Sequence, residues 1–249
     1  MTVDLAPIVP YLSDLRAGRP LAVLTGAGVS AESGLPTFRG PGGLWEGVRA
    51  EELATPEAFV RDPVKVWRFY EWRREKVRAA RPNGAHLALA RLEATLPRMT
   101  LITQNVDGLH RAAGSRRLIE LHGNLLRDRC AGCGQVSPAP ERPYEVLPPR
   151  CPPCAGVLRP DVVWFGESLP SDAWHAAETA AEESAVFLVV GTSSVVAPAS
   201  SLGLLAARAG AHLFEINPEA TPIAPLAEGV FRTSASEVMA ALAHALGAR

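Results

Sequence analysis

The sequence predicts an α/β fold in which a parallel sheet carries helices on both faces and a smaller domain is inserted. Short apolar runs typical of buried strands alternate with longer stretches whose apolar residues recur at helical spacing. Two segments interrupt this alternation: 41–84, with a glycine-rich lead-in and one helix, and 127–158, with many prolines and all the cysteines. We expect these segments to form the smaller domain. Residues 1–40, 85–126 and 159–249 are then expected to form the larger, discontinuous one.

Five apolar runs are expected to be the strands of the sheet: Leu21–Thr25, Met99–Thr103, Leu118–Leu121, Ala185–Val190 and Ala211–Ile216. The first run is followed by glycine, and the others are followed by polar residues. In an open parallel sheet, ligands bind in a crevice outside the carboxyl ends of the strands. The residues that follow the strands are therefore expected to gather in one crevice, although they lie far apart in the sequence.

Four stretches are expected to be helices: Pro63 to about Ala79, Asn83 to about Leu96, Ser201–Ala209, and a last one that ends near Leu246. Asp62 is expected to cap the first helix, because its carboxylate can accept from backbone N–H groups of the first turn. Proline at the first helical position supports this start. Ser234 or Ser236 is the expected cap of the last helix.

The chain carries a formal net charge of −1 over 249 residues, so long-range attraction to nucleic acid or to an anionic membrane is not expected. The sequence contains no run of about 18 apolar residues that would predict a membrane span. Residues 1–10 lack the basic stretch and apolar core of a secretory signal. We expect a cytoplasmic monomer that binds neither a membrane nor a specific nucleic acid.

The cysteines form two Cys-x-x-Cys pairs, Cys130 with Cys133 and Cys151 with Cys154. Each pair can turn tightly enough to offer two thiolates to one tetrahedral ion, and the spacing matches a four-cysteine zinc site. Because four thiolates leave no open position for water, we expect one structural Zn²⁺ per chain. The alternatives are two redox-active motifs and a ribbon that binds nucleic acid, and the near-neutral charge disfavours the ribbon.

The strand Leu21–Thr25 runs directly into Gly26-Ala-Gly-Val-Ser-Ala31, which fits the G-x-G-x-x-A pattern of dinucleotide-binding folds. Such a loop lets backbone amides approach a pyrophosphate closely. A dehydrogenase would continue with a regular helix and an acidic residue about 20 positions on. Here Pro36 and the glycines up to Gly43 forbid such a helix, and Glu46 stands at the right count in the wrong context. A Rossmann-like domain with a flexible loop over the nucleotide is expected instead of a hydride-transfer domain.

A series of motifs, in order along most of the chain, closely resembles the sirtuin family. They are Gly26–Arg39 (GAGVSAESGLPTFR), Thr103–His110 (TQNVDGLH), Leu121–Asn124 (LHGN), the cysteine pairs, Val163–Glu167 (VWFGE), Gly191–Ser193 and Asn217–Glu219. The resemblance implies an NAD-dependent protein-lysine deacylase that consumes NAD as a co-substrate. It further implies acyl-lysine proteins or peptides as partners, and nicotinamide and O-acyl-ADP-ribose as products.

The resemblance also implies the roles of individual residues. His122 would be the general base, which suits an imidazole because it titrates near neutrality, and Asn105 would be the second catalytic residue. Val163, Phe165, Gly166 and Glu167 would border the peptide, which docks as an added strand. The NAD-binding residues would be Gly26, Ala27, Gly28, Glu32, Phe38, Arg39, Trp45, Gln104, Asn105, Val106, Asp107, Gly191, Thr192, Ser193, Asn217, Pro218, Glu219 and Ala235.

The implied mechanism begins with attack of the acyl oxygen on the nicotinamide ribose, so that nicotinamide leaves. His122 then helps a ribose hydroxyl attack the resulting imidate, and water completes the reaction. Such chemistry needs a closed, dry pocket, because the reactive centre would otherwise be captured by water.

The helix after Asp62 carries Tyr70 and Arg73, which are three residues apart and so share one face. A phenol and a guanidinium together can bind a carboxylate, the guanidinium through a bidentate fork. The pair resembles the feature of the sirtuin branch that accepts succinyl and malonyl groups, so removal of these groups is expected besides deacetylation. The alternative is a solvated basic face, because the helix also carries Arg68, Arg74 and Arg78.

Two other functions stay open at this point. One is a mono-ADP-ribosyltransferase on the same fold, and the other is a non-enzymatic adaptor built on the zinc ribbon. The strand-end residues Asn105, Asp107 and His122 favour an enzyme. Release of nicotinamide that depends strictly on an acyl-peptide would separate the deacylase from the transferase.

Overall fold

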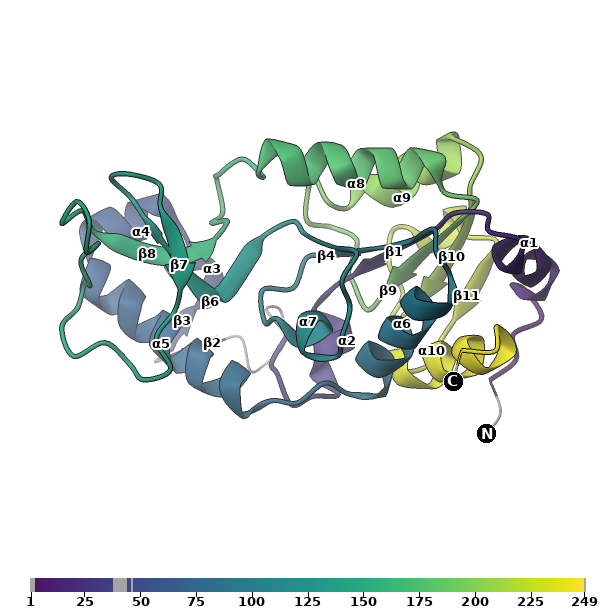
Figure 1. Ribbon diagram of the computed structural model, residues 1–249, viewed down its shortest axis with the longest axis horizontal. Coiled ribbons are helices and arrows are strands. Elements are labelled where there is room, and N and C mark those ends of the chain that lie inside the picture. The colour runs from purple at the N-terminus through teal and green to yellow at the C-terminus, as the bar shows by residue number, and fades with distance from the viewer. Residues whose placement is uncertain (1–2, 38–43, 46, 249) are drawn as a thin grey trace.

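The computed structural model describes residues 3–37, 44–45 and 47–248, and a six-stranded parallel sheet forms its centre (Figure 1). The strands lie in the order β11-β10-β9-β1-β4-β5. Their bounds are β1 Leu21–Thr25, β4 Met99–Thr103, β5 Leu118–Glu120, β9 Val186–Val190, β10 His212–Ile216 and β11 Gly229–Phe231. The predicted fold class is confirmed, and the expected strands are present to within one residue at each end.

Strand β1 lies in the middle of the sheet and defines its switch point. The chain passes from β1 to β4 and β5 on one side and then returns to β9, β10 and β11 on the other. Thr25, the last residue of β1, is in register with Thr103 of β4 and Val190 of β9, so the three strands end level. A crevice for a ligand forms at such a point, outside the carboxyl ends of the strands.

Helices cover both faces of the sheet (Figure 1). α6 (Gly84–Thr95) and α10 (Ala235–Ala245) pack together on one face, and α8 (Ser171–Glu183) and α9 (Ser201–Arg208) pack together on the other. Shorter helical segments lie between the strands and at the N-terminal end: η1 Val9–Tyr11, α1 Leu12–Arg16, α2 Ala27–Ala31, α7 Leu109–Ala112 and η3 Ala224–Leu226.

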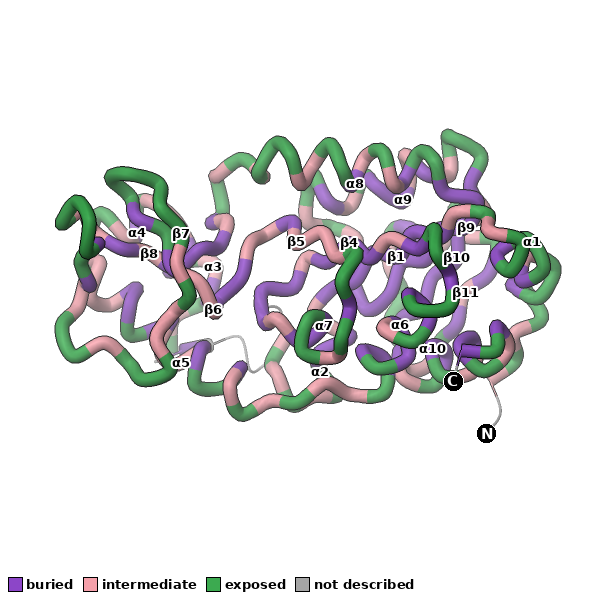
Figure 2. The backbone as a smooth tube through the Cα atoms, in the orientation of Figure 1, coloured by how far each residue is buried: buried purple, intermediate pink, exposed green. Residues whose placement is uncertain are grey.

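The side chains of β1 belong to the hydrophobic cores on both faces of the sheet. All of its residues are buried, and Figure 2 shows the centre of the sheet in purple. Successive side chains of a strand point to opposite faces. Leu21 and Val23 therefore pack in the core with α6 and α10, whereas Ala22 and Leu24 pack in the core with α8 and α9.

The remaining elements form what we call the small module, which comprises a three-stranded antiparallel sheet, a hairpin and three helices. Their bounds are β2 Leu44–Trp45, β3 Val48–Arg49, α3 Ala50–Leu53, α4 Pro56–Arg61, α5 Pro63–Ala79, β6 Gly123–Cys130, β7 Val136–Pro138 and β8 Leu158–Val162. The sheet has the order β7-β6-β8. As predicted, Asp62 caps α5, its carboxylate accepting the backbone N–H of Lys65 at 2.9 Å. Strand β6 spans the expected domain boundary between residues 126 and 127; the division into domains stays a prediction.

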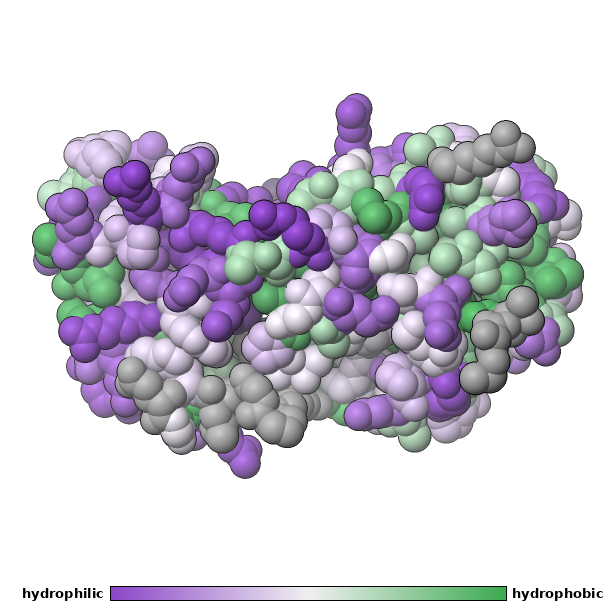
Figure 3. Space-filling model, turned by 90° about the horizontal axis from the view of Figure 1, so that it is seen from below, coloured by the Kyte–Doolittle hydropathy of each residue, from purple (hydrophilic) through white to green (hydrophobic). Residues whose placement is uncertain are grey.

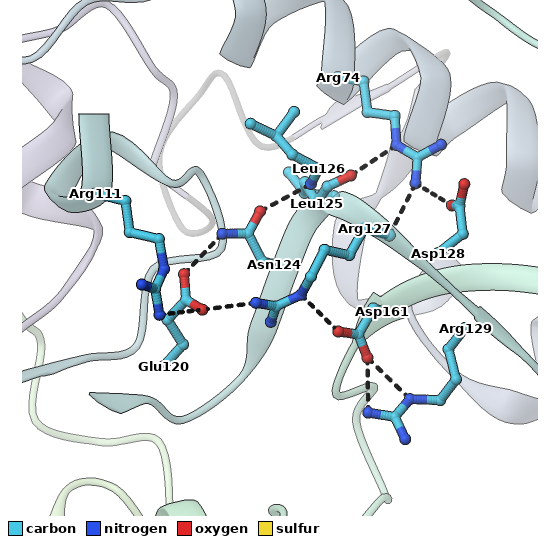
Figure 4. Close-up of polar contacts among 10 residues, drawn as sticks. All are labelled: Arg74, Arg111, Glu120, Asn124, Leu125, Leu126, Arg127, Asp128, Arg129 and Asp161. Carbon is cyan, nitrogen blue, oxygen red and sulfur yellow. Dashed lines mark hydrogen bonds and ion pairs between the residues drawn. The ribbon is translucent and has the colours of Figure 1, made fainter. Parts of the chain in front are cut away.

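Arg74 shows that α5 does not present a uniformly solvated basic face. Its side chain is 0% exposed, and its guanidinium donates to the backbone oxygens of Leu125 (2.7 Å) and Arg127 (3.2 Å) and to the carboxylate of Asp128 (Figure 4). Arg127 in turn donates to Asp161 of β8 at 2.9 Å. These contacts fix β6 between α5 and β8.

Helix α8 was not expected from the sequence. Its buried contacts come from alanines such as Ala177 and Ala181, and small side chains give a weak hydrophobic pattern. Strand β11 was also missed, because it has only three residues and begins with Gly229. Along the residues that the structure describes, no helix is both long and apolar enough to cross a membrane.

Candidate active site

The glycine loop after β1 packs tightly against the loop after β9. The Gly26 N–H donates to the Val190 oxygen at 3.0 Å, and the Gly28 N–H donates to the Gly191 oxygen at 2.8 Å. A Cβ atom on Gly26 would lie 2.6 Å from Cβ of Thr192, and one on Gly28 would lie 2.8 Å from the Gly191 oxygen. These distances leave no room for a side chain. The glycines therefore also serve to bring the ends of β1 and β9 together, besides the close approach of a nucleotide that the sequence predicts.

A hydrogen-bonded group of Ser30, Asn105 and Asp107 lies at this edge of the sheet. The Ser30 hydroxyl donates to Asp107 Oδ2 at 2.7 Å, and Asn105 Nδ2 donates to Ser30 Oγ at 3.1 Å and to the Gly26 oxygen at 3.0 Å. Asp107 Oδ1 accepts the backbone N–H of Leu109 at 2.8 Å. The loops after β1 and β4 are thus joined, as the strand-end rule predicts. Ser30 itself was not singled out from the sequence.

His86 approaches the same serine from α6 and was also missed. Its Nε2 lies 3.4 Å from Ser30 Oγ, whereas the serine hydrogen is directed to Asp107 across 2.7 Å. Its Nδ1 lies 3.0 Å from Asn83 Oδ1 and 3.3 Å from the Asn83 backbone nitrogen, in the capping box that begins α6. Burial lowers the pKa of His86, so the ring is neutral at pH 7. The available signal was a histidine three residues after an asparagine cap, where glutamate is usual.

His122 follows β5 and contacts the backbone after β4. Its Nδ1 lies 2.9 Å from the Gln104 carbonyl oxygen, which can only accept, so Nδ1 carries the hydrogen. Nε2 is then the basic nitrogen of the ring. Burial lowers the pKa of His122, and the bond to Gln104 offsets part of that effect. The imidazole is therefore a neutral base near pH 7.

Gln104 and Asn217 tie the crevice to the loops after β9 and β10. Gln104 Nε2 donates to Thr192 Oγ1 at 3.0 Å, and Asn217 Nδ2 donates to the Thr192 oxygen at 2.8 Å. On the far side, the Ser236 N–H donates to Glu32 Oε1 at 3.2 Å, which joins the start of α10 to the glycine loop. The predicted NAD-binding residues that follow β1, β4, β9 and β10, and those at the start of α10, thus lie at one edge of the sheet.

The segment Val163–Glu167 runs beside His122. The Val163 N–H donates to the His122 backbone oxygen at 2.9 Å. Glu167 accepts two bonds from the guanidinium of Arg159, at 2.5 and 2.8 Å, and the Phe165 ring is 44% exposed. The segment predicted to border a peptide is therefore fixed at both ends and offers an exposed aromatic side chain between them.

Tyr70 and Arg73 lie between this segment and the nucleotide crevice. Tyr70 is 1% exposed, its oxygen accepts the indole N–H of Trp164 at 2.8 Å, and the Arg73 guanidinium carbon lies 5.8 Å from the centre of its ring. Burial lowers the pKa of Arg73, and Tyr70 and Asp107 oppose that shift. Arg73 lines a cavity together with Asn105 and Asp107. Figure 3 shows the surface hollowed between the small module and the part of the molecule that holds the six-stranded sheet.

The four cysteines come together at the outer end of the small module. Their sulfur atoms all lie within 4.8 Å of one another, and zinc–sulfur bonds of about 2.3 Å would place them roughly 3.8 Å apart. A Cβ atom on Gly156 would lie 3.0 Å from Cys130 Sγ, so glycine is needed where the two turns meet. The donor set fits a tetrahedral Zn²⁺ closed to water, as predicted.

Three of the predicted NAD-binding residues differ from the others in placement. Phe38 and Arg39 lie outside the residues that the structure describes. Trp45 belongs to the core of the small module, where its ring lies 5.8 Å from that of Phe69 and is 8% exposed. Its predicted contact with a nucleotide stays a prediction.

Comparisons of the chain with known proteins agree with this geometry. A family model described as "Sir2 family" matches residues 26–198. The chain is 55% identical over 225 residues to an NAD-dependent protein deacylase 2 from Pyrobaculum aerophilum, covering 90% of each chain. It is also 55% identical over 232 residues to an NAD-dependent protein deacylase from Thermus thermophilus, covering 92% of this chain and 91% of that one.

Comparison with solved structures also finds Sir2 proteins. A Sir2 homolog in complex with NAD superimposes with a TM-score of 0.89 at 48% identity, covering 96% of this chain and 93% of that one. A complex described as Sir2, p53 peptide and NAD⁺ superimposes with a TM-score of 0.85 at 32% identity, covering 96% of this chain and 98% of that one.

Proposed function

The chain belongs to the Sir2 family, and from this premise we propose that it removes acetyl, succinyl and malonyl groups from lysine side chains in proteins and peptides. It is an NAD-dependent protein deacylase, the activity named for relatives more than 50% identical across about nine-tenths of its length. The observation that carries the catalytic part of the proposal is the placement of His122, a neutral base whose Nδ1 is engaged by Gln104 at 2.9 Å.

His122 would accept a proton at Nε2. When bound, NAD supplies the ribose hydroxyl that receives the acyl group and the nicotinamide that departs. A ring with Nδ1–H held by a carbonyl presents the Nε2 lone pair in a fixed direction. Lowering of the pKa by burial keeps that lone pair available at neutral pH. His122 is thus proposed as the general base.

Asn105 and Asp107 would hold the nicotinamide end of the dinucleotide. Asp107 accepts from Ser30 and from a backbone N–H, so its carboxylate is oriented before any ligand enters. The Asn105 amide is fixed by two bonds from Nδ2, to Ser30 and to the Gly26 oxygen, and these bonds aim the carboxamide. Polar groups that are held in place in advance cost little reorganisation when the substrate binds.

Acidic acyl groups would bind at Tyr70 and Arg73. The guanidinium of Arg73 lines the cavity beside Asn105 and Asp107, where the acyl end of a lysine would have to reach. Burial of this cation makes a carboxylate partner favourable, because an ion pair is screened less away from water. The exposed guanidinium of Arg68, on the same helix, has no such surroundings.

The four-cysteine cluster holds a structural zinc ion. Cys130, Cys133, Cys151 and Cys154 supply all four ligands, so no position remains for a substrate or water. The metal fixes the Cys130 end of β6 and the turns beside it.

The test is mass spectrometry of reactions that contain NAD and peptides carrying acetyl-, succinyl- or malonyl-lysine. His122→Ala should lower turnover of every peptide at least about 100-fold, since general-base catalysis contributes that much. The matched control is His175→Ala, an exposed histidine on α8, which should retain wild-type turnover. Nicotinamide release in the absence of acyl-peptide would favour the mono-ADP-ribosyltransferase alternative.

The acyl preference needs a second pair of variants. Arg73→Met should reduce succinyl-lysine turnover roughly tenfold to hundredfold, the value of a charge-assisted hydrogen bond, and should leave acetyl-lysine turnover within a few-fold. Arg68→Met is the control on the same helix and should change neither. Equal losses on both peptides in Arg73→Met would refute a dedicated carboxylate contact.

A further inference from the structure

Trp164 connects the segment beside His122 to the acyl pair. Its indole N–H donates to the Tyr70 oxygen at 2.8 Å, and both residues are buried, at 3% and 1% exposed. The rings lie 6.5 Å apart. The sequence predicts Val163, Phe165, Gly166 and Glu167 to border the peptide and gives Trp164, which lies between them, no role of its own. The tryptophan itself was treated as part of a motif.

We propose that Trp164 is a positioning residue for acyl selection, because its indole N–H directs the Tyr70 hydroxyl to donate to the carboxylate of an acidic acyl group. The inference rests on the proposed function, namely that succinyl- and malonyl-lysine are substrates. It adds a third residue to Tyr70 and Arg73, and it assigns that residue a role through hydrogen-bond direction.

The Tyr70 oxygen lies against two groups that can only donate hydrogen bonds. An indole nitrogen is a donor only, so the Tyr70 oxygen must accept in its bond with Trp164. The other polar group against the phenol is the Arg73 guanidinium, which also only donates. Neither neighbour can take the phenol hydrogen. Among residues 3–37, 44–45 and 47–248, the structure shows no contact that accepts that hydrogen, and the carboxylate of an acidic acyl group can supply an acceptor.

Two further features suit the site to an acidic acyl group. Burial raises the pKa of Tyr70, so the hydroxyl stays protonated at neutral pH. The acidic neighbour Glu167 is held in a two-bond ion pair with Arg159, at 2.5 and 2.8 Å, so its charge is already balanced. A second carboxylate from the acyl group therefore meets cationic and O–H groups.

Trp164 is itself held firmly. The Arg159 guanidinium carbon lies 3.4 Å from the centre of its ring, and its backbone N–H donates to Glu167 Oε2 at 2.8 Å. The indole can therefore fix the phenol without moving. The same segment borders the proposed peptide site, so a bound peptide and the acyl pair share one support.

The experiment measures kcat and KM on succinyl- and acetyl-lysine peptides for the wild type, Trp164→Phe, Tyr70→Phe and the double variant. Phenylalanine keeps an aromatic ring against Arg159 and removes the N–H. Trp164→Phe should raise the KM for the succinyl peptide about threefold to tenfold, the value of one hydrogen bond, with kcat nearly unchanged. A contact to the far end of the acyl group is made equally before and during reaction, so it acts on KM. The effect is measured as the ratio of succinyl to acetyl kcat/KM, which should fall about threefold to tenfold.

The double variant tests whether Trp164 acts through Tyr70. In the Tyr70→Phe background, Trp164→Phe should have no further effect on the ratio of succinyl to acetyl turnover, because the acceptor is gone. The matched control is Trp67→Phe, which also removes a buried indole N–H of the small module, there donated to the Leu158 oxygen at 3.0 Å. Trp67→Phe should leave the ratio as in the wild type.

The possible results distinguish a failure of the role of Trp164 from a failure of the proposed succinyl and malonyl removal. A wild type that turns over acetyl but not succinyl or malonyl peptides overturns both. A wild type that turns over succinyl peptide, with an unchanged ratio in Trp164→Phe or additive effects in the double variant, overturns the role of Trp164 alone. If Trp164→Phe does not fold, incorporation of benzothienylalanine at position 164 replaces the N–H by sulfur in a ring of the same shape and decides the same question.

Discussion

Removal of the Asp128 carboxylate should destabilise the protein by about 4 kcal/mol. Asp128 and Arg74 form an ion pair in which both side chains are 0% exposed. Asp128→Ala leaves a buried cation without its main partner, which costs about 3–5 kcal/mol. Glu71, 3.1 Å from Arg74 and 12% exposed, remains as a second partner and favours the low end of that range. Tyr144 also loses the acceptor of its 2.6 Å bond, which adds about 1 kcal/mol.

The assay is urea unfolding at pH 7, followed by tryptophan fluorescence. Trp67 is a suitable reporter, because the Arg74 guanidinium lies 5.1 Å from its ring centre and the Tyr144 ring lies 5.5 Å away. A loss of about 4 kcal/mol is a large part of the roughly 5–15 kcal/mol that stabilises a typical domain. The midpoint should fall, while the slope that reports exposed surface stays constant.

The control is Asp14→Ala, which removes the carboxylate of a surface pair. Arg19 lies 4.0 Å from Asp14, and the two side chains are 62% and 55% exposed. Such pairs contribute about 0–1 kcal/mol, so this variant should unfold almost as the wild type does. A loss below about 1 kcal/mol in Asp128→Ala, at constant slope, would refute the view that the buried cation depends on this carboxylate.

Three further predictions concern pH and metal. Because burial lowers the pKa of His122 and the neutral ring is the proposed base, the acid limb of kcat/KM for an acetyl-lysine peptide should lie below pH 6.5; a limb at or above that value contradicts the assignment. Burial lowers the pKa of His110 to about 3, so the unfolded chain binds this proton first and stability should fall from pH 6.5 toward pH 3. His110→Gln should flatten that fall in unfolding experiments across this range, and an identical slope would speak against it. Elemental analysis should find one Zn²⁺ per chain, and Cys151→Ala should lose both the metal and the cooperative unfolding of the small module; full stability without metal would exclude a structural zinc.

The sheet and the crevice could be predicted because each follows from a local pattern. A strand such as β1, buried on both faces, must be apolar at every position, and it ends where polar residues or glycine begin. The rule that ligands bind at the carboxyl ends of parallel strands then placed Asn105, Asp107 and His122 together. Hydrogen bonds and backbone contacts now join the loops that carry them.

The polar groups beneath the crevice could not be predicted in the same way. Ser30 and His86 lie 56 residues apart, and their contact depends on how α6 packs against the glycine loop. The buried ion pair of Arg74 could not be predicted either, because its partner Asp128 is 54 residues away. The sequence of α5 shows Arg74 only as one of several arginines. Burial of a polar side chain requires a partner, and the partner is supplied by tertiary structure. The hydrogen bond between Trp164 and Tyr70 could not be predicted for the same reason.

The zinc cluster and the proposed base are joined by one strand, β6. β5 ends at the crevice, His122 follows soon after, and β6 then runs from Gly123 to Cys130. β6 pairs with β8 at both ends, Gly123 with Val162 and Cys130 with Leu158. At Gly123 the strands approach so closely that a Cβ atom would lie 2.1 Å from the Asp161 oxygen, and its φ of 79° favours glycine. The residue after His122 is therefore held by close packing, and the far end of the same strand is held by a thiolate ligand of the metal. The base and the metal ligand Cys130 are thus joined through a single strand, and the packing at Gly123 holds the end nearer to His122.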